Sequence, residues 1–251
     1  MKKSIKTILV LIPSLCLILG CSISYSNGEI YINGGEKISG NGEITTKTIS
    51  TRGYDIIKAT GFMDIHLKKG PEGRITVSTD DNLHEYITIE VKDNILFLKT
   101  KENINIETKT GVHITVPFKV ISKVALTGSG NIETKDMISV SEFTASVTGS
   151  GDVVLAVEAS KVQAIITGSG DITISGSTSN IEVNLSGSGD FNGFDIDSQN
   201  TSVSVSGSGD AEVVANESLV ARVNGSGNII YKGNPEKKDI KTSGSGNISS
   251  Y

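Results

Sequence analysis

Hydrophobic and polar residues alternate along most of this chain, and one repeated phrase interrupts the alternation at regular intervals. From residue 128, the phrase Gly-Ser-Gly followed by Asn or Asp occurs seven times, at spacings of 21, 19, 19, 20, 18 and 19 residues. Around the third copy, for example, Ala164 and Ile166 precede Gly168 at alternate positions, and Ile172 follows it. A period of two is typical of strands with one buried face, and no recurrence at three and four residues supports a helix.

Each repeat therefore predicts a strand, a glycine corner, a second strand and a variable loop such as 175–180 or 195–200. A period near 20 residues is typical of a solenoid, in which neighbouring coils bury each other's apolar faces. We predict an all-β fold, a parallel β-helix or solenoid with coils of about 19 residues stacked about 4.8 Å apart. An antiparallel β-sandwich array, with the same phrase at each turn, is the alternative.

Two physical reasons explain glycine at the corners. Glycine adopts positive φ without steric cost, and it leaves room where the interior narrows at a bend. Counting by twos from the inward residues reaches both glycines of each copy, which favours the second reason. We expect the Asn or Asp that follows to bond nearby backbone. The predicted structural corners are Gly128, Gly130, Gly149, Gly151, Gly168, Gly170, Gly187, Gly189, Gly207, Gly209, Gly225, Gly227, Gly244 and Gly246.

The preceding part of the chain is a diverged version of the same pattern. Segments 40–44 and 61–65 resemble the corner loosely, 21 residues apart. Segments 74–79 and 84–91 have the composition of strands, and Asp93-Asn94 between two apolar segments predicts a hairpin. We predict one β-solenoid domain over 44–251, with a diverged half at 44–126 that closes one end and the repeats at 127–251.

The N-terminus has the features of a lipoprotein signal peptide. Lys2, Lys3 and Lys6 precede a short apolar segment, and 18–21 reads Ile-Leu-Gly-Cys, which resembles a bacterial lipobox. We predict a signal peptide at 1–20, lipidation of Cys21 and a flexible tether over 21–43. Two acyl chains would hold the chain stably on a membrane. The alternative is an ordinary secretory signal with an incidental cysteine.

The predicted address is the cell envelope, with the lipid anchor in the outer membrane of a Gram-negative bacterium. No acidic cluster follows Cys21 closely, which favours an anchor that faces the periplasm. Loss of the three signal-peptide lysines leaves 20 basic and 28 acidic residues, a net charge of −8. An acidic protein without a basic patch is a poor ligand for nucleic acid, so we expect no nucleic-acid partner.

Composition supports a folded, repetitive protein. The chain has 28 glycines and 4 prolines, and its 37% of hydrophobic residues is sufficient for a core. Residues 127–233 carry 13 acidic and 4 basic side chains, so the repeats present an acidic surface. Lys237, Lys238 and Lys241 near the end are interpreted as a charged cap.

The repeated acids are the only candidate metal site. Asp152, Asp171, Asp190 and Asp210 would stack about 5 Å apart, and a bound cation such as calcium could relieve their repulsion. The alternative is a solvated column of turn-capping side chains. A phosphate-binding loop is excluded because no lysine and helix follow the glycines.

No catalytic residue is predicted. His66, His84 and His113 are isolated, without metal-ligand spacing, and are interpreted as surface or packed residues. The acids are spread periodically rather than gathered in one cleft, and we expect no cofactor. Columns of hydroxyls at Thr127, Thr148, Thr167, Ser186 and Ser206 could bond a polymer, although the chain has no Trp to stack on sugars.

Three features together resemble a known family, described as putative auto-transporter adhesin, head GIN domain. They are the segment 61–67 (Gly-Phe-Met-Asp-Ile-His-Leu), the segment 77–83 (Val-Ser-Thr-Asp-Asp-Asn-Leu) and the repeated corners, and the resemblance covers about 50–250. It implies an all-β, β-helix-like fold on secreted or lipidated proteins of Bacteroidota-like bacteria, and it brings no catalytic residues.

These observations predict a lipid-anchored envelope protein that is not an enzyme. Its role would be an interaction or structural module, as an adhesin with an unknown protein or glycan partner. The alternative function is a carbohydrate-binding or carbohydrate-active β-helix protein.

Overall fold

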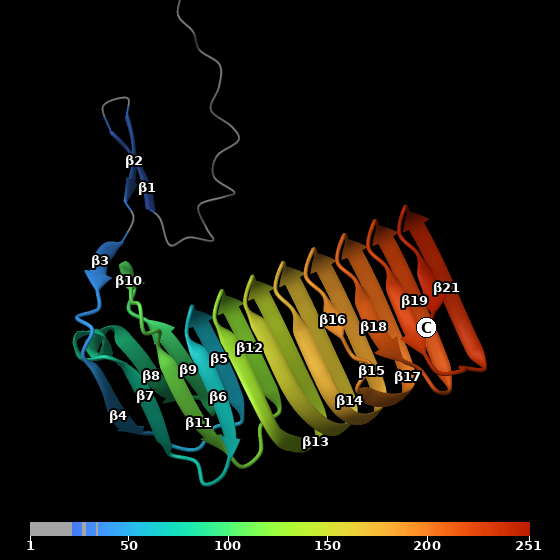
Figure 1. Cartoon of the computed structure of the whole chain (residues 1–251), viewed down its shortest axis with the longest axis horizontal. Helices are drawn as coiled ribbons and strands as arrows, with labels where there is room; N and C mark the ends of the chain where they lie inside the picture. The colour runs from blue at the N-terminus through green and yellow to red at the C-terminus, as the bar shows by residue number, and fades with distance from the viewer. Residues whose placement is uncertain (1–21, 27–28, 34) are drawn as a thin grey trace, which may run out of the picture.

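The chain forms a parallel β-solenoid (Figure 1). The structure, a computed structural model, describes residues 22–26, 29–33 and 35–251, so the predicted signal peptide and Cys21 lie outside it. One 18-stranded sheet winds through the coils, and every pairing between successive repeats is parallel. This confirms the predicted solenoid over the antiparallel sandwich.

The strands fall into an N-terminal group and a repeat group. The N-terminal strands are β1 (Ser22–Ser26), β2 (Glu29–Asn33), β3 (Glu36–Ser39), β4 (Ile44–Ser50), β5 (Ile56–Gly61), β6 (Asp64–Lys69), β7 (Arg74–Asp80), β8 (Ile87–Lys92), β9 (Ile95–Thr100), β10 (Ile104–Glu107) and β11 (His113–Phe118). The repeat strands are β12 (Lys123–Gly128), β13 (Asn131–Gly149), β14 (Asp152–Gly168), β15 (Ile172–Gly187), β16 (Phe191–Asn192), β17 (Ile196–Gly207), β18 (Ala211–Val214), β19 (Ser218–Gly225), β20 (Ile229–Lys232), β21 (Lys237–Gly244) and β22 (Ile248–Ser250). A 3₁₀ helix, η2 (Asp81–Tyr86), precedes β8.

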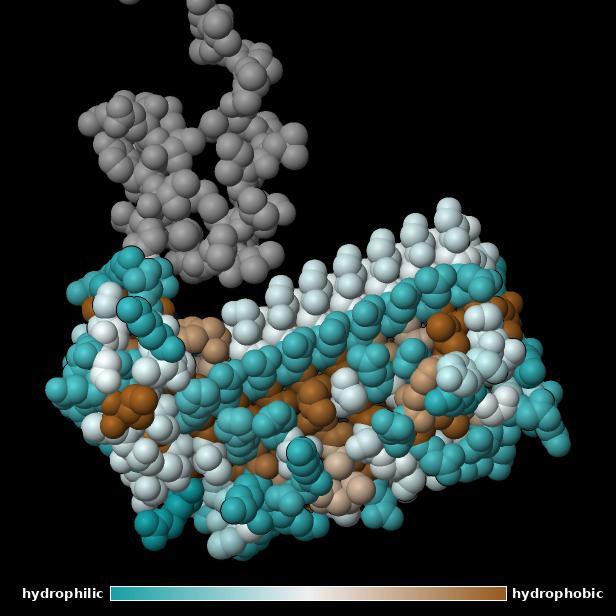
Figure 2. Space-filling model, viewed as in Figure 1, coloured by the Kyte–Doolittle hydropathy of each residue, from teal (hydrophilic) through white to brown (hydrophobic). Residues whose placement is uncertain are grey.

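Identical positions of successive coils pair with one another. Gly61 pairs with Gly128, and the pairing continues through the first glycine of every later corner to Gly244. Side chains of one kind therefore form rows along the axis, which Figure 2 shows as a hydrophilic row beside a paler crest. The predicted stacking of equivalent residues along the axis is confirmed.

The core lies between the two legs of each coil. Alternate residues of both legs are fully buried, as Val162, Ala164 and Ile166 show before one corner and Ile172 and Ile174 show after it. The outward residues between them are partly or fully exposed. The period-two pattern read from the sequence is thus the pattern of burial.

Each corner is hydrogen-bonded to the corner of the preceding coil through one carbonyl oxygen, which accepts two backbone N–H groups. The oxygen of Gly149 accepts the N–H of Ser169 at 2.8 Å and the N–H of Gly170 at 3.0 Å. The same pair of bonds recurs at all seven repeated corners, beginning with the two that the Gly61 oxygen accepts from Ser129 and Gly130. Each corner is therefore bonded to the preceding coil at the point where the chain turns.

The two glycines of a corner are required for different reasons. The first has φ between +121° and +138° in every copy, a region that favours glycine, and it is half-exposed rather than inward-facing. The second is buried in the first six copies, and its φ is not positive in any copy. A Cβ on Gly168 would overlap the oxygen of Gly149, and one on Gly170 would overlap the oxygen of Gly151. The prediction that both glycines face a narrow interior is therefore wrong for the first, and the close approach is to the neighbouring coil.

Buried hydroxyl groups shape the bends opposite the corners. Thr178 accepts the N–H of Asn180 at 3.3 Å and donates to its carbonyl oxygen at 3.0 Å. Ser198 donates to the oxygen of Asn200 at 3.2 Å in the next coil. These bonds satisfy polar groups that the bend would otherwise bury without partners.

The N-terminal end is closed by antiparallel strands. β8 and β9 form the predicted hairpin, and its two turn residues Asp93 and Asn94 both have positive φ. On the other leg, β7 pairs antiparallel with both β4 and β11. The helix η2 buries Leu83 completely between these strands.

Three details of this end differ from the sequence-based expectation. Segment 40–44 is not a corner, because it joins β3 to β4 and its Gly42 N–H donates to Asp80 at 2.6 Å. The predicted strand at 84–91 starts only at Ile87, after η2. β3 pairs with β10 inside the segment predicted as tether, so strand pairing begins before residue 44.

The last coil, β21 and β22, has no successor among the described residues. Its inward positions Lys238, Ile240 and Thr242 pair with the buried Leu219, Ala221 and Val223 of the coil before. The residues of β21 are exposed throughout. Two of these three residues, Lys238 and Thr242, are polar where the coil before has apolar residues.

A test of the corner geometry is the substitution Gly168→Ala. We expect it to lower the free energy of unfolding by at least about 2 kcal/mol, because positive φ strains alanine and the new Cβ overlaps the neighbouring coil. Urea unfolding followed by circular dichroism would measure the change.

Ser169→Ala, at the exposed residue between the two glycines, is the matched control and should change stability by less than about 0.5 kcal/mol. Equal effects of the two substitutions would contradict the assigned role of the first glycine.

Candidate functional site

The Asn and Asp residues after the corners form a bonded column along the solenoid. The Oδ1 of Asp171 accepts the backbone N–H of Asp190 at 2.8 Å, and the Oδ1 of Asp190 accepts that of Asp210 at 2.8 Å. Equivalent bonds join Asp152 to Asp171, Asp210 to Asn228, and Asn228 to Asn247. These five side chains thus bond the following coil. The sequence had suggested instead that they cap their own turn.

A cation column at Asp152, Asp171, Asp190 and Asp210 stays a prediction. One oxygen of each carboxylate is already committed to a backbone N–H, which partly offsets the repulsion between neighbours. Within residues 35–251, no group of three or more His, Cys, Asp or Glu side chains has a geometry that could hold a metal ion. Melting curves in calcium against a chelator are the direct measurement.

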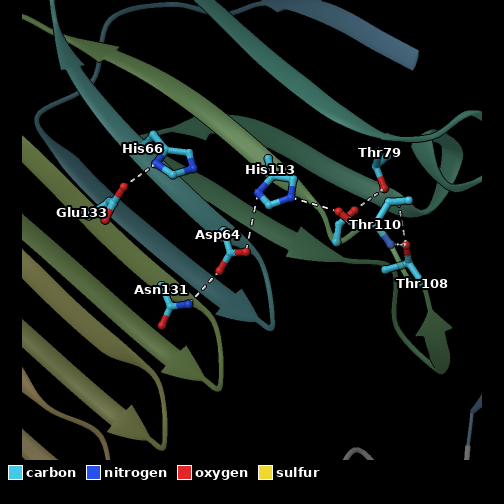
Figure 3. A network of polar contacts seen from close by, with 9 residues as sticks. Asp64, His66, Thr79, Thr108, Thr110, His113, Asn131 and Glu133 are labelled. Atoms are coloured by element: carbon cyan, nitrogen blue, oxygen red, sulfur yellow. Dashed lines mark hydrogen bonds and ion pairs between the residues drawn. The ribbon is translucent and has the colours of Figure 1, made fainter. Parts of the chain in front are cut away.

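Two of the three histidines meet at the start of this column (Figure 3). The Nδ1 of His66, on β6, lies 2.8 Å from the Oε1 of Glu133, on β13. The ring of His66 stacks with that of His113, on β11, with the ring centroids 6.2 Å apart. His113 Nδ1 lies 3.6 Å from Asp64, which also accepts a bond from Asn131 at 2.8 Å. Parallel pairing of β11, β6 and β13 brings these residues together from distant parts of the sequence.

This histidine cluster is a surface arrangement. Both imidazole side chains are nearly half exposed, at 45% and 46%, in a shallow depression of about 380 Å³. The Nε2 of His113 donates to the oxygen of Thr110 at 3.0 Å, so that ring nitrogen is occupied. The expectation that these histidines lie at the surface is confirmed for His66 and His113, and the site lacks the enclosure that acid–base catalysis uses.

A buried carboxylate organises the N-terminal end. Asp80, only 1% exposed, accepts bonds from the hydroxyls of Thr108 and Thr110 and from the N–H of Gly42. The hydroxyl of Thr108, more than the other donors, lowers the pKa of Asp80 from 3.8 because hydrogen bonds favour the charged form. Asp80 therefore fastens the loop before β4 to the loop before β11.

The residues after Asp80 extend this fastening. Asn82 accepts the N–H of Asn41 at 3.0 Å and donates to the oxygen of Ser39 at 2.9 Å. The hydroxyl of Thr45 and the ammonium of Lys47 lower the pKa of Asp81. The segment 77–83, one of the family cues in the sequence, is thus the clamp that joins β3 and β4 to the solenoid.

The third histidine belongs to the same end. Nε2 of His84 lies 3.0 Å from the hydroxyl of Thr45. Partial burial, followed by the charge of Lys47, lowers the pKa of His84 from 6.5, so the neutral imidazole is favoured. His84 is therefore a packed residue of the clamp.

Two further concave regions are larger than the depression at the histidines. A cleft of about 740 Å³ lies beside the clamp and is lined by Phe62, Asp80 and the loops 39–42 and 106–111. A groove of about 570 Å³ crosses the bends of four coils, between β13 and β17. The groove lining lies within the strands β13, β14, β15 and β17, so the expectation of loops at 175–180 and 195–200 is wrong for most of these residues. The sequence did not reveal the groove, because these segments carry no repeated phrase.

The predicted hydroxyl column lies elsewhere. Thr127, Thr148, Thr167, Ser186 and Ser206 are exposed and occupy equivalent positions immediately before the corners. They form an exposed row beside the corners, whereas the groove lies at the bends.

The model of the family described as putative auto-transporter adhesin, head GIN domain, matches residues 53–235. The chain belongs to this family. The match begins just before β5 and ends after β20, so it spans the first corner and most of the repeats. The head GIN domain of this chain is therefore the solenoid itself.

Solved structures resemble the head GIN domain closely. A Bacteroides fragilis protein described as a putative adhesin has a TM-score of 0.80 at 22% identity, over 85% of this chain and 100% of its own. A Parabacteroides distasonis putative adhesin has a TM-score of 0.71 at 28% identity, over 86% and 100%. A putative lipid binding protein from the same organism has a TM-score of 0.71 at 26% identity, over 86% and 100%. No curated protein matches the chain.

The column predicts a difference between two substitutions at Asp190. Asp190→Ala removes the acceptor for the Asp210 N–H, so we expect the free energy of unfolding to fall by about 1 kcal/mol. Asp190→Asn keeps an acceptor and removes one charge from the row, so its stability should equal or exceed that of the parent chain. Urea midpoints of the two variants measure this, and equal losses would contradict the role of the acceptor.

The clamp predicts an acid-sensitive contribution from Asp80. Because its pKa is lower in the folded chain than the ordinary 3.8, its stabilisation is complete above that value and is lost as pH falls through the lower folded pKa. We expect the stability difference between the parent chain and Asp80→Asn to be large at pH 6 and smaller at pH 3. Urea midpoints at both values give the comparison, and a constant difference would contradict the assignment.

Proposed function

We propose that the chain is a lipid-anchored protein of the cell envelope and acts as a non-enzymatic interaction module. Family membership supports the general class, an adhesin-like protein of the cell surface or envelope. The lipobox-like segment ending in Cys21 supports the anchor. No helix within the described ranges is long and apolar enough to cross a membrane.

The observation that carries the proposal is the use of the repeated polar residues. Corner serines and column acids are the most numerous candidates for chemistry, and they occupy equivalent positions on every coil. The column side chains bond the next coil, so their role is structural. Other titratable residues form pairs on the open surface, as at His66 and His113, or belong to the clamp, as Asp80 does, and both arrangements suit a rigid scaffold.

The position of the N-terminal segment indicates which end of the solenoid the tether would hold. β3 enters the solenoid beside β10, at the end closed by the antiparallel strands. The last coil lies at the far end of the row of coils in Figure 1. A tether that starts at Cys21 would therefore hold the solenoid by its closed end and present the coils outward.

Carbohydrate binding is the second candidate function, and the groove across the bends favours it. Its lining is rich in hydroxyl, amide and carboxylate groups, which hydrogen-bond sugars. Turnover of a polysaccharide would make the chain carbohydrate-active rather than only binding.

Replacement of Cys21 tests the anchor. We expect Cys21→Ser to abolish incorporation of labelled fatty acid and to move the chain from the membrane to the soluble envelope fraction, since the thiol that carries the lipid is gone. Protease treatment of whole cells then locates the solenoid: digestion indicates surface display, and full protection rules out a surface adhesin. A parent chain without fatty acid, or a Cys21→Ser variant still in the membrane, would contradict the anchor.

A further inference from the structure

The groove at the bends is built from equivalent positions of four successive coils. Val140, Ala159 and Thr178 pair in register and form its floor. On one side of the floor stands the column of Ser139, Glu158, Ser177 and Asp197. On the other side stand Ser160, Ser179 and Gln199. The groove therefore runs along the solenoid axis, in the direction in which an extended polymer would lie.

Apart from Asp197, which accepts one bond from Asn216, the side chains of the two walls form no hydrogen bond within the described residues. Glu158 and Ser177 are exposed, and neither side chain bonds another residue in 35–251. Ser160 and Ser179 are also exposed, and only their backbone oxygens are used, by Asn side chains of the following coils. The floor hydroxyl of Thr178 differs, because it is already bonded to the backbone of Asn180 in its own bend. Unused donors and acceptors thus line the walls while the floor is already satisfied.

The charge of the groove selects the kind of ligand. Glu158 and Asp197 are its only charged lining residues, and neither forms an ion pair within the described part of the chain. Asp197 accepts one bond, from Asn216 at 2.6 Å. A positively charged ligand would complement this pair, and an anionic one would be repelled.

The distance between the two carboxylates indicates the repeat length of the ligand. Glu158 pairs with Ser177, and Ser177 pairs with Asp197, so the carboxylates stand in one column two coils apart. Two strand spacings are about 10 Å. This is close to the disaccharide repeat of an extended β-1,4-linked glycan, in which every second sugar faces the same way.

We propose that this groove binds an extended β-1,4-linked glycan whose sugars carry free amino groups. Amines on alternate sugars pair with Glu158 and Asp197, and hydroxyls between them bond Ser177 and the opposite wall. The inference rests on the proposed interaction function and names its partner class. An extended peptide fits less well, because the floor is shallow and offers only Val140 and Ala159 as apolar contacts for side chains.

The test is binding of a fluorescent glucosamine hexamer to the purified full-length chain in neutral detergent, measured by anisotropy at low salt. We expect saturable binding that Glu158→Gln with Asp197→Asn weakens at least tenfold, at an unchanged melting midpoint. The N-acetylated hexamer, which lacks the charge, should also bind at least tenfold more weakly. Higher salt should weaken binding of the parent chain.

The matched control is Glu182→Gln with Glu212→Gln, which removes two charges outside the groove and should change binding by less than twofold. Equal losses in both double variants would indicate unspecific attraction and overturn the site. No binding by the parent chain, or a lysine oligomer bound more tightly than the hexamer through the same pair, would also overturn it. None of these failures affects the anchor, which the Cys21 substitution tests separately.

Discussion

The whole solenoid depends on one contact, in which the carbonyl of the first corner glycine accepts two N–H groups of the next coil. This contact brings two backbones so close that neither glycine can carry a Cβ. It also fixes the register at one point of every coil, because a slip of one residue would place a side chain against that carbonyl. The in-register core, the column of acids and the row of hydroxyls all follow from this alignment.

The repeats were predictable because the strands and the turn of each coil follow from the sequence of that coil alone. Alternation defined which residues are inward, and the corner phrase defined where the chain turns. The role of the first glycine was harder to assign, since parity along one chain says nothing about the distance to the next coil. The column acids were misjudged for the same reason: their partner is 18 to 20 residues away, on a neighbouring coil.

The closed end and the candidate sites were less predictable, because they rest on contacts between distant residues. Asp80 meets Thr108 and Gly42, and His66 meets Glu133, across separations of 28 to 67 residues. The groove is assembled from bends whose sequences differ from coil to coil. The repeated residues therefore form the scaffold, whereas the unrepeated residues of the clamp and the bends form the surfaces that distinguish this chain.

The unequal ends of the solenoid have a consequence for how far the molecule can reach. The closed end holds the antiparallel strands and the clamp, whereas the last described coil resembles those before it and has Lys238 and Thr242 at inward positions. Gain or loss of one 19-residue unit in the middle would leave both ends unchanged. Each unit would lengthen the solenoid by about 4.8 Å, so the number of repeats sets the distance between its two ends.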